Sequence, residues 1–151
     1  MIIGIDVGKS GGFAVRNGIS LVLHKMPETE GDILALLEKL AVPEAVAYVE
    51  LVPIGMPGKG AAMAKLNANA AFIRGVIMAL KIRMILVRPS EWQSFFNLGK
   101  RATCKSDSEW KNKLKAEAQR RFPGVLITHQ TADALLILEW AQATQTLSSV
   151  Q

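Results

Sequence analysis

The sequence predicts an α/β domain built on a mixed five-stranded sheet that is flanked by helices. The chain opens with three short extended segments separated by glycine-bearing turns, which is typical of an antiparallel meander. Two later apolar segments each follow a helical pattern, which indicates parallel strands joined by helices. Half of the 151 residues are hydrophobic and 21% are charged, so the chain can bury a core.

The first three strands are predicted from local patterns. Residues 1–7 are rich in β-branched side chains, and residues 11–15 resume an extended pattern after a turn. The pair Asn17-Gly18 is typical of a two-residue hairpin turn, and residues 19–23 then alternate between apolar and polar side chains. These segments predict three consecutive antiparallel strands.

The remaining elements alternate between helix and strand, and we expect residues 1–151 to form one domain. Residues 32–40 carry apolar side chains at helical spacing, and residues 46–52 form a compact apolar strand. The later elements are, in chain order, a helix over 61–80, a strand over 84–87, a helix over 92–96 capped by Ser90, a helix over 108–121, and a last helix that opens at Thr131. The polar tail from Thr144 is expected to be frayed.

The composition argues against a membrane or secreted protein. No apolar stretch approaches the roughly 18 uninterrupted residues of a membrane span. The apolar N-terminal run lacks a basic segment before it and is interrupted by Asp6, unlike a signal peptide. The single cysteine, Cys104, cannot form an internal disulfide, which suits a reducing compartment. We therefore expect a cytoplasmic location.

The positive charge is confined to one segment. The formal net charge is +5. Residues 99–121 hold eight basic and three acidic side chains, so this segment alone carries 8 − 3 = +5 and the rest of the chain is neutral. Such a segment is typical of a surface that binds a polyanion, although a solvated lysine-rich helix gives the same pattern.

Two acidic residues interrupt predicted core strands. Asp6 lies between Ile5 and Val7, and Glu50 is the only charged residue between positions 45 and 58. A lone ionised carboxylate in a core strand is costly unless something compensates its charge. The alternatives are a strand-end position for Asp6 and an exposed edge for Glu50.

A third acid, Asp133, lies near the start of the last helix. An acid at that place can simply complement the helix dipole. However, Leu136, Ile137 and Trp140 share its face at helical spacing, so Asp133 heads the predicted buried stripe. If the three carboxylates meet, they favour hard cations such as Mg²⁺, and two such ions support in-line hydrolysis of a phosphodiester. His129, four residues earlier, could ligate a metal, orient water, shuttle a proton or have no role.

Several of these segments resemble one family of nucleases. They are GIDVG at residues 4–8, YVE at 48–50, VRPSEWQ at 87–93, RFP at 121–123 and ADALL at 132–136. In this order they resemble the RuvC-like Holliday-junction resolvases, and within that family the phage and plant organellar branch. The resemblance spans nearly the whole chain and implies the ribonuclease H-like fold, with its antiparallel strands 1–3 followed by parallel strands.

The resemblance also implies an activity and a site. It assigns the role of catalytic acids to Asp6, Glu50 and Asp133. These acids are expected to bind two Mg²⁺ ions, for which Mn²⁺ can substitute. The family often places another acid or a histidine shortly before the last aspartate. Position 130 is a glutamine here, so His129 is our candidate for a fourth metal ligand and catalytic group.

The implied substrate is branched DNA, cut by a homodimer in the cytoplasm of a bacterium or a phage-infected cell. The expected phosphate contacts are Lys59, Lys100, Arg101 and Lys105. The alternatives are a YqgF-like ribonuclease with similar acids and a junction-binding protein without catalysis. Sugar kinases and actin-like ATPases begin with a similar strand but need two lobes, so no nucleotide cofactor is expected.

Overall fold

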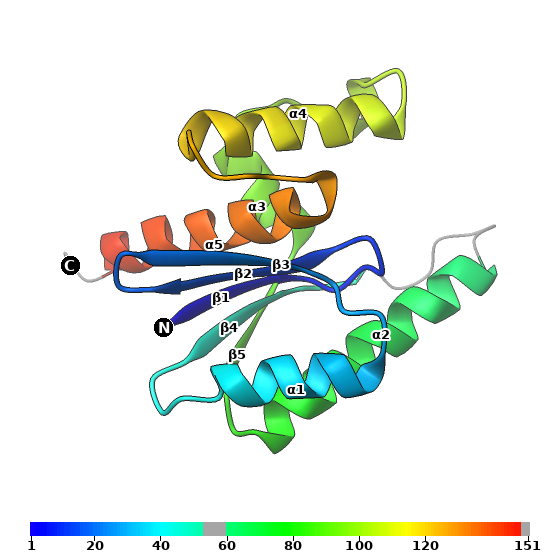
Figure 1. Ribbon diagram of the computed structural model, residues 1–151. Helices are drawn as coiled ribbons and strands as arrows, with labels where there is room; N and C mark the ends of the chain where they lie inside the picture. Colours follow the sequence, from blue (N-terminus) through cyan, green and yellow to red (C-terminus); the bar gives the residue numbers. More distant parts are fainter. Residues whose placement is uncertain (53–59, 149–151) are drawn as a thin grey trace.

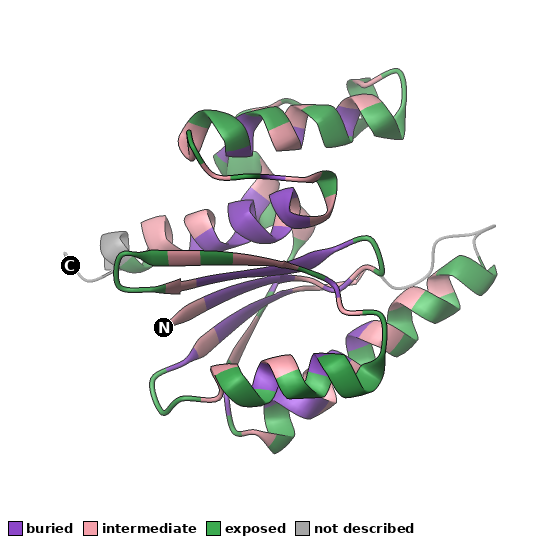
Figure 2. Cartoon of the chain, in the orientation of Figure 1, coloured by how far each residue is buried: buried purple, intermediate pink, exposed green. Residues whose placement is uncertain are grey.

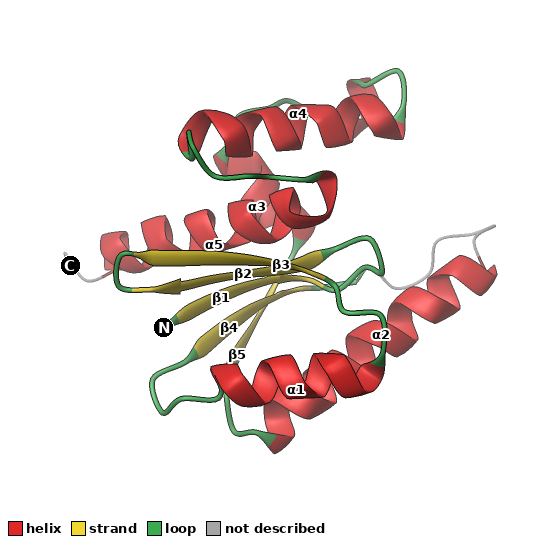
Figure 3. Cartoon of the chain, in the orientation of Figure 1, coloured by secondary structure: helices red, strands yellow, loops and turns green. Residues whose placement is uncertain are grey.

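The strands form one mixed sheet in the order β3-β2-β1-β4-β5. The computed structural model describes residues 1–52 and 60–148. In it, β1 (Ile2–Asp6), β2 (Gly12–Asn17) and β3 (Ser20–Lys25) form an antiparallel meander, whereas β4 (Val46–Glu50) and β5 (Arg83–Val87) continue the sheet in parallel with β1 (Figure 3). The predicted sheet, antiparallel over its first three strands and parallel afterwards, is confirmed.

The helices cover both faces of this sheet. Figure 1 shows α1 and α2 together on one face and α5 on the other, with α4 as an outer layer beyond α5. The helices are α1 (Glu30–Leu40), α2 (Gly60–Ala79), α3 (Pro89–Phe95), α4 (Asp107–Arg121) and α5 (His129–Ser148), with a short 3-10 turn at Arg101–Thr103 before α4. Within the described part of the chain, no helix is long and apolar enough to cross a membrane.

The sheet separates two hydrophobic cores, and Figure 2 shows buried residues in the strands and in the helices on both sides of the sheet. Side chains alternate along each strand, so successive residues belong to different cores. Ile3 and Ile5 of β1 belong to the core beneath α1 and α2. The second core joins α5 to α3 and α4 through residues that include Trp92 and Leu114. Because both cores rest on the central strand β1, the end of β1 is held firmly in place.

A glycine in β1 lets α5 lie directly on the sheet. A Cβ at Gly4 would stand 2.3 Å from the carbonyl oxygen of Ala134 and 2.7 Å from the backbone nitrogen of Leu138. Both atoms belong to the α5 backbone, which cannot move aside cheaply. Gly4 therefore sets how close the first turns of α5, including Asp133, lie to β1.

Two predicted helix boundaries are wrong. The helix after β5 is not capped by Ser90, because α3 begins at Pro89 and the Glu91 carboxylate accepts the Arg88 N–H at 2.7 Å. The last helix begins at His129 rather than Thr131, because the Thr128 carbonyl already accepts the N–H groups of Thr131 and Ala132.

The tail that the sequence predicts to be frayed begins at Thr144, and α5 is helical as far as Ser148. The Thr144 hydroxyl donates to the carbonyl oxygens of Trp140 and Ala141, and the Gln145 amide donates to the Tyr48 hydroxyl. These bonds tie residues 144 and 145 to the preceding turn of α5 and to the sheet.

Candidate active site

The three acids singled out from the sequence lie at one end of the sheet. β1 and β4 are parallel and Ile5 is in register with Val49, so the next residues, Asp6 and Glu50, occupy adjacent strand ends. α5 begins over the same end of the sheet (Figure 1) and carries Asp133 in its second turn. All three residues line one cleft of about 490 Å³. Its walls also include the first turns of α2 and one face of α4.

The turn after β1 shapes the position of Asp6. The Gly8 N–H donates to Asp6 Oδ1 at 3.0 Å. A Cβ at Gly11 would stand 2.6 Å from Asp6 Cγ, so any side chain there would displace the carboxyl group. The glycines of this turn therefore allow the backbone to wrap closely around the carboxylate.

Burial disfavours the charged forms of all three acids, and repulsion from neighbouring carboxylates adds to this effect at Glu50 and Asp133. Burial raises the pKa of Asp6, partly offset by the Gly8 hydrogen bond and the charge of Lys111. Burial, followed by the charges of Asp6 and Asp133, raises the pKa of Glu50 well above its ordinary value. Burial and the charge of Asp6 raise the pKa of Asp133 to about 7. The protein therefore holds more negative charge in this cleft than its own cations neutralise.

The donor set fits hard divalent cations, which prefer carboxylate oxygens. The side chains share the cleft but are not closed around one point: no group of three acidic, histidine or cysteine side chains in the described residues is compact enough to hold a single ion. Carboxylates of like charge repel one another, so shared cations would lower the cost of bringing them together. Asp6, Glu50 and Asp133 are the residues that would hold such ions.

Two basic residues reach the same cleft. Arg101, predicted as a phosphate contact, lines it and forms an ion pair with Asp107 at 2.7 Å. Lys111 also lines it, and its charge lowers the pKa of both Asp6 and Asp133. Lys111 was not among the predicted phosphate contacts. The available signal was its place one turn before the apolar Leu114, which marks the inner face of α4.

His129 lies at the first position of α5 and lines the cleft with Asp133. Its Nε2 is 2.8 Å from Asn112 Oδ1 in α4. An amide oxygen can only accept, so this bond places the proton on Nε2 and leaves Nδ1 as the basic nitrogen of the neutral ring. The structure thus brings His129 to the acids, and its orientation depends on α4.

Trp92 is a further neighbour of the acids that the sequence analysis did not assign to the site. Its side chain is fully buried, and among the described residues its Nε1–H has no hydrogen-bond partner of good geometry. The indole N–H is nevertheless near enough to Glu50 to lower that carboxyl's pKa slightly. A small rotation of Glu50 would satisfy this buried donor.

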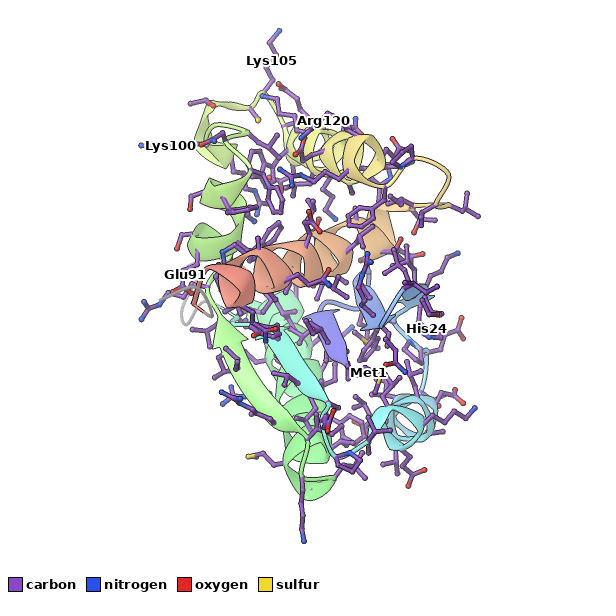
Figure 4. The ribbon with its side chains drawn as sticks, turned by 90° about the vertical axis from the view of Figure 1, so that its left-hand side faces the viewer. Met1, His24, Glu91, Lys100, Lys105 and Arg120 are labelled. Carbon is purple, nitrogen blue, oxygen red and sulfur yellow. The ribbon has the colours of Figure 1, made fainter. Side chains whose placement is uncertain are left out.

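Two other predicted phosphate contacts, Lys100 and Lys105, do not line the cleft. Lys100 and Lys105 are exposed, and Figure 4 shows both side chains pointing outward from the loop before α4. Lys59 lies outside the described residues. All three remain predicted DNA contacts, and Lys100 and Lys105 lie outside the cleft.

Much of the basic segment is neutralised within the protein. Half of its eight basic side chains form ion pairs with nearby acids: Arg101, Lys113, Arg120 and Arg121. Arg120 and Arg121 both pair with Glu117, and Arg121 also pairs with Glu139 of α5. The high local charge seen in the sequence therefore serves in part to fasten α4 to α5.

Comparison with solved structures identifies this architecture. The chain is similar to RuvC of Thermus thermophilus, with a TM-score of 0.61 and 13% identity over 97% of this chain and 96% of that one. The same RuvC in complex with a Holliday junction substrate gives a TM-score of 0.61 with 12% identity over 97% and 94%.

A viral protein shows the same arrangement. The Fowlpox virus resolvase, solved with a substrate Holliday junction, gives a TM-score of 0.55 and 12% identity over 95% of this chain and 99% of that one. No family model and no curated protein matches the sequence. The sheet order, the helices on both faces and the nearly complete coverage of each chain establish that this protein has the ribonuclease H-like fold of RuvC and the poxvirus resolvase.

Proposed function

We propose that this protein is a metal-dependent endonuclease that resolves four-way, or Holliday, DNA junctions. The observation that carries the proposal is the set of three carboxyl groups at one end of the sheet, in one cleft, with raised pKa values and two basic residues beside them. A protein that only bound DNA would gain nothing from buried negative charge facing phosphate. The fold neighbours solved with Holliday junctions support the choice of substrate.

In the proposed reaction, the residues that would hold two Mg²⁺ ions, or Mn²⁺ in their place, are Asp6, Glu50 and Asp133. The chemistry that these ions supply is activation of a water molecule and stabilisation of the departing oxygen. Lys111 and Arg101 offset the charge of the phosphate that is cut. His129, with Nδ1 as its basic nitrogen, either accepts a proton from the attacking water or completes the ligand set. The Trp92 indole N–H, which is buried without a partner of good geometry among the described residues, would donate to Glu50 if that side chain turned toward it to bind a metal ion.

We further propose that the protein acts as a homodimer. A four-way junction carries two symmetry-related strands that must be cut, and a twofold dimer presents two identical sites in matching orientation. The exposed Lys100 and Lys105 would then contact the phosphates of the junction arms without reading bases.

The decisive experiment compares substrates. Purified protein is incubated with labelled four-way junctions, flaps, linear duplex DNA and structured RNA, each with Mg²⁺, Mn²⁺ or EDTA. We expect paired, symmetric nicks in the four-way junction with either metal and none in EDTA. Junction binding without cleavage under every divalent ion would indicate a catalytically silent protein. Cleavage of RNA alone would favour the ribonuclease alternative.

The raised pKa values predict a pH-dependent stability in the absence of divalent ions. Because folding raises the pKa of Asp133 from 3.8 to about 7, the folded state keeps a proton that the unfolded state releases. The stabilisation is fully present below pH 3.8 and is lost as the pH rises through about 7. We expect the free energy of unfolding in EDTA to fall over this range by about 2 kcal/mol from Asp133, which is partly open to solvent.

Denaturant-induced unfolding of the wild type and of Asp133→Asn at several pH values measures this effect. His24 acts in the opposite direction, since burial lowers its pKa from 6.5, so the difference between wild type and variant isolates the acid. Mg²⁺ should stabilise the wild type more at pH 8 than at pH 5, because it binds the ionised carboxylates. Equal pH profiles for the two proteins would show that Asp133 does not titrate as the geometry predicts.

A further inference from the structure

A second hollow, of about 770 Å³, lies beside the cleft that holds the acids. Three lysines from three different elements line it: Lys9 in the turn after β1, Lys25 at the end of β3 and Lys65 in α2. The glycine-bearing turn 8–11 separates the two spaces, because Gly8, Ser10 and Gly11 line the cleft whereas Lys9 lines the hollow.

Two helices are shared between the cleft and the hollow. α2 contributes Leu66 to the cleft and Lys65 to the hollow, and α5 contributes Asp133 to the cleft and Gln130 to the hollow. The dividing turn is fixed on both sides. The Asn69 amide donates to the Val7 carbonyl oxygen at 2.6 Å, and a Cβ at Gly12 would stand 2.9 Å from the Gln130 carbonyl oxygen. The cleft and the hollow therefore lie on the two sides of one turn that is held by contacts to α2 and α5.

The three lysines are available to a ligand. All three are exposed, and within the described residues none lies within 4.0 Å of a carboxylate, in contrast to the paired arginines of α4. Glu28 and Glu30 also line the hollow, so its lining carries a net charge of 3 − 2 = +1. Glu30 lies in the first turn of α1, where an acid complements the helix dipole, so its presence has a separate structural reason.

We infer that this hollow binds the sugar-phosphate backbone of the cleaved strand, at the phosphates next to the one that is cut. This inference rests on the proposed nuclease function. Ammonium groups that converge from separate elements suit successive backbone phosphates, which they contact without regard to base sequence. Holding the strand beyond the turn would fix the phosphate over Asp6, Glu50 and Asp133, so the hollow would contribute to substrate affinity rather than to the hydrolytic step.

The test neutralises all three lysines together, as Lys9→Gln, Lys25→Gln and Lys65→Gln. We expect the Kd for a four-way junction to rise about 10- to 30-fold. The slope of log K against log salt should become shallower by about 2 to 3, near 0.9 for each phosphate that is no longer neutralised. The cleavage rate at saturating junction should change less than about threefold, because the acids remain in place.

A matched control carries Lys39→Gln, Lys81→Gln and Arg83→Gln. All three residues are exposed; Lys81 and Arg83 flank the start of β5, at the opposite end of the sheet, and Lys39 lies in the last turn of α1, outside the lining of the hollow. The control removes the same charge and should change the salt slope by less than about 1. Thermal melts of both variants check that each is folded.

A second measurement locates the contact on the DNA. Neutral methylphosphonate linkages replace the phosphates next to the cut, one at a time. The wild type should bind the junction more weakly when one or two of these phosphates are replaced. The triple variant should bind the modified and the unmodified junctions with the same affinity. An unchanged Kd and salt slope in the triple variant, while the wild type binds and cuts junctions, would overturn the inference alone. A wild type that neither binds nor cuts nucleic acid would overturn the proposed function as well.

Discussion

Asp6→Asn is expected to abolish junction cleavage while junction binding persists. Asparagine has nearly the same shape and can still accept the Gly8 N–H at Oδ1, so the turn around it is retained. The asparagine amide is neutral, however, so it lacks the negative charge with which a carboxylate binds a divalent cation. We expect the cleavage rate to fall at least about 1,000-fold, which corresponds to about 4 kcal/mol of lost transition-state stabilisation.

The same substitution is expected to stabilise the folded protein in EDTA. Asp6 is a buried carboxyl group whose charge raises the pKa of both Glu50 and Asp133. Its replacement removes that repulsion, so the pKa values of the two remaining acids should fall and the metal-free melting temperature should rise. Opposite signs for activity and stability are characteristic of a site that is arranged for a ligand.

Single-turnover cleavage, junction binding and thermal melts measure these effects. Glu38→Gln is the matched control, because it removes one negative charge from an exposed position on α1. The control should cut junctions at the wild-type rate and melt at the wild-type temperature. Cleavage by Asp6→Asn at that rate would remove Asp6 from the site.

Gly4→Ala is expected to cause a larger loss of stability than any of the other substitutions. The added methyl group would meet the Ala134 carbonyl oxygen at 2.3 Å and the Leu138 backbone nitrogen at 2.7 Å. Neither atom can move unless α5 moves away from β1 as a whole. Overpacking of this kind costs about 1–3 kcal/mol, and two backbone clashes should place Gly4→Ala at about 3 kcal/mol or more.

Gly75→Ala is the matched control for this substitution. Gly75 lies inside α2, and a Cβ there would meet no atom within 4 Å beyond the helix's own backbone. Because alanine favours the helix, Gly75→Ala should stabilise the fold by about 0.5–1 kcal/mol. Urea unfolding of both variants makes the comparison. If Gly4→Ala were neutral, α5 would not lie as closely on β1 as the structure has it.

A displaced α5 also has a functional consequence. Asp133 lies on α5 one residue before Ala134, so a shift that relieves the Gly4 clash moves this carboxyl group away from Asp6. Gly4→Ala should therefore reduce junction cleavage even at temperatures where it remains folded. Gly75→Ala should leave cleavage unchanged.

The sheet and the three acids were predictable because their signals are local. Period-two patterns and the Asn17-Gly18 turn define strands whatever lies around them, and the sheet has the predicted order of antiparallel and parallel pairs. Asp6 and Glu50 stood out because a charge inside an apolar strand is costly wherever that strand packs. Their predicted convergence needed one further assumption, that β1 and β4 are neighbours, and the parallel register bears it out.

Helix boundaries were less predictable because several caps compete at each end. Ser90 is a favourable cap, but Pro89 and Glu91 together begin α3 one residue earlier. Likewise, the polar composition after Thr144 gives no sign that α5 continues there, although a hydrogen bond joins Gln145 to Tyr48, 97 positions earlier. A hydrogen bond between residues so far apart in the sequence cannot be predicted from a local sequence pattern.

The order of residues along the chain was enough to establish the mixed sheet, the central place of Asp6 and Glu50, and the position of Asp133 at the head of a buried helical stripe. The folded structure was needed to show which basic residues reach those acids. Lys111 enters the cleft and Arg101 lines it while pairing with Asp107, whereas Lys100 points away. The physical reason is that burying a charge is costly wherever the strand packs, so the sequence alone reveals it. Whether a surface lysine reaches the acids depends instead on how α4 lies against α5.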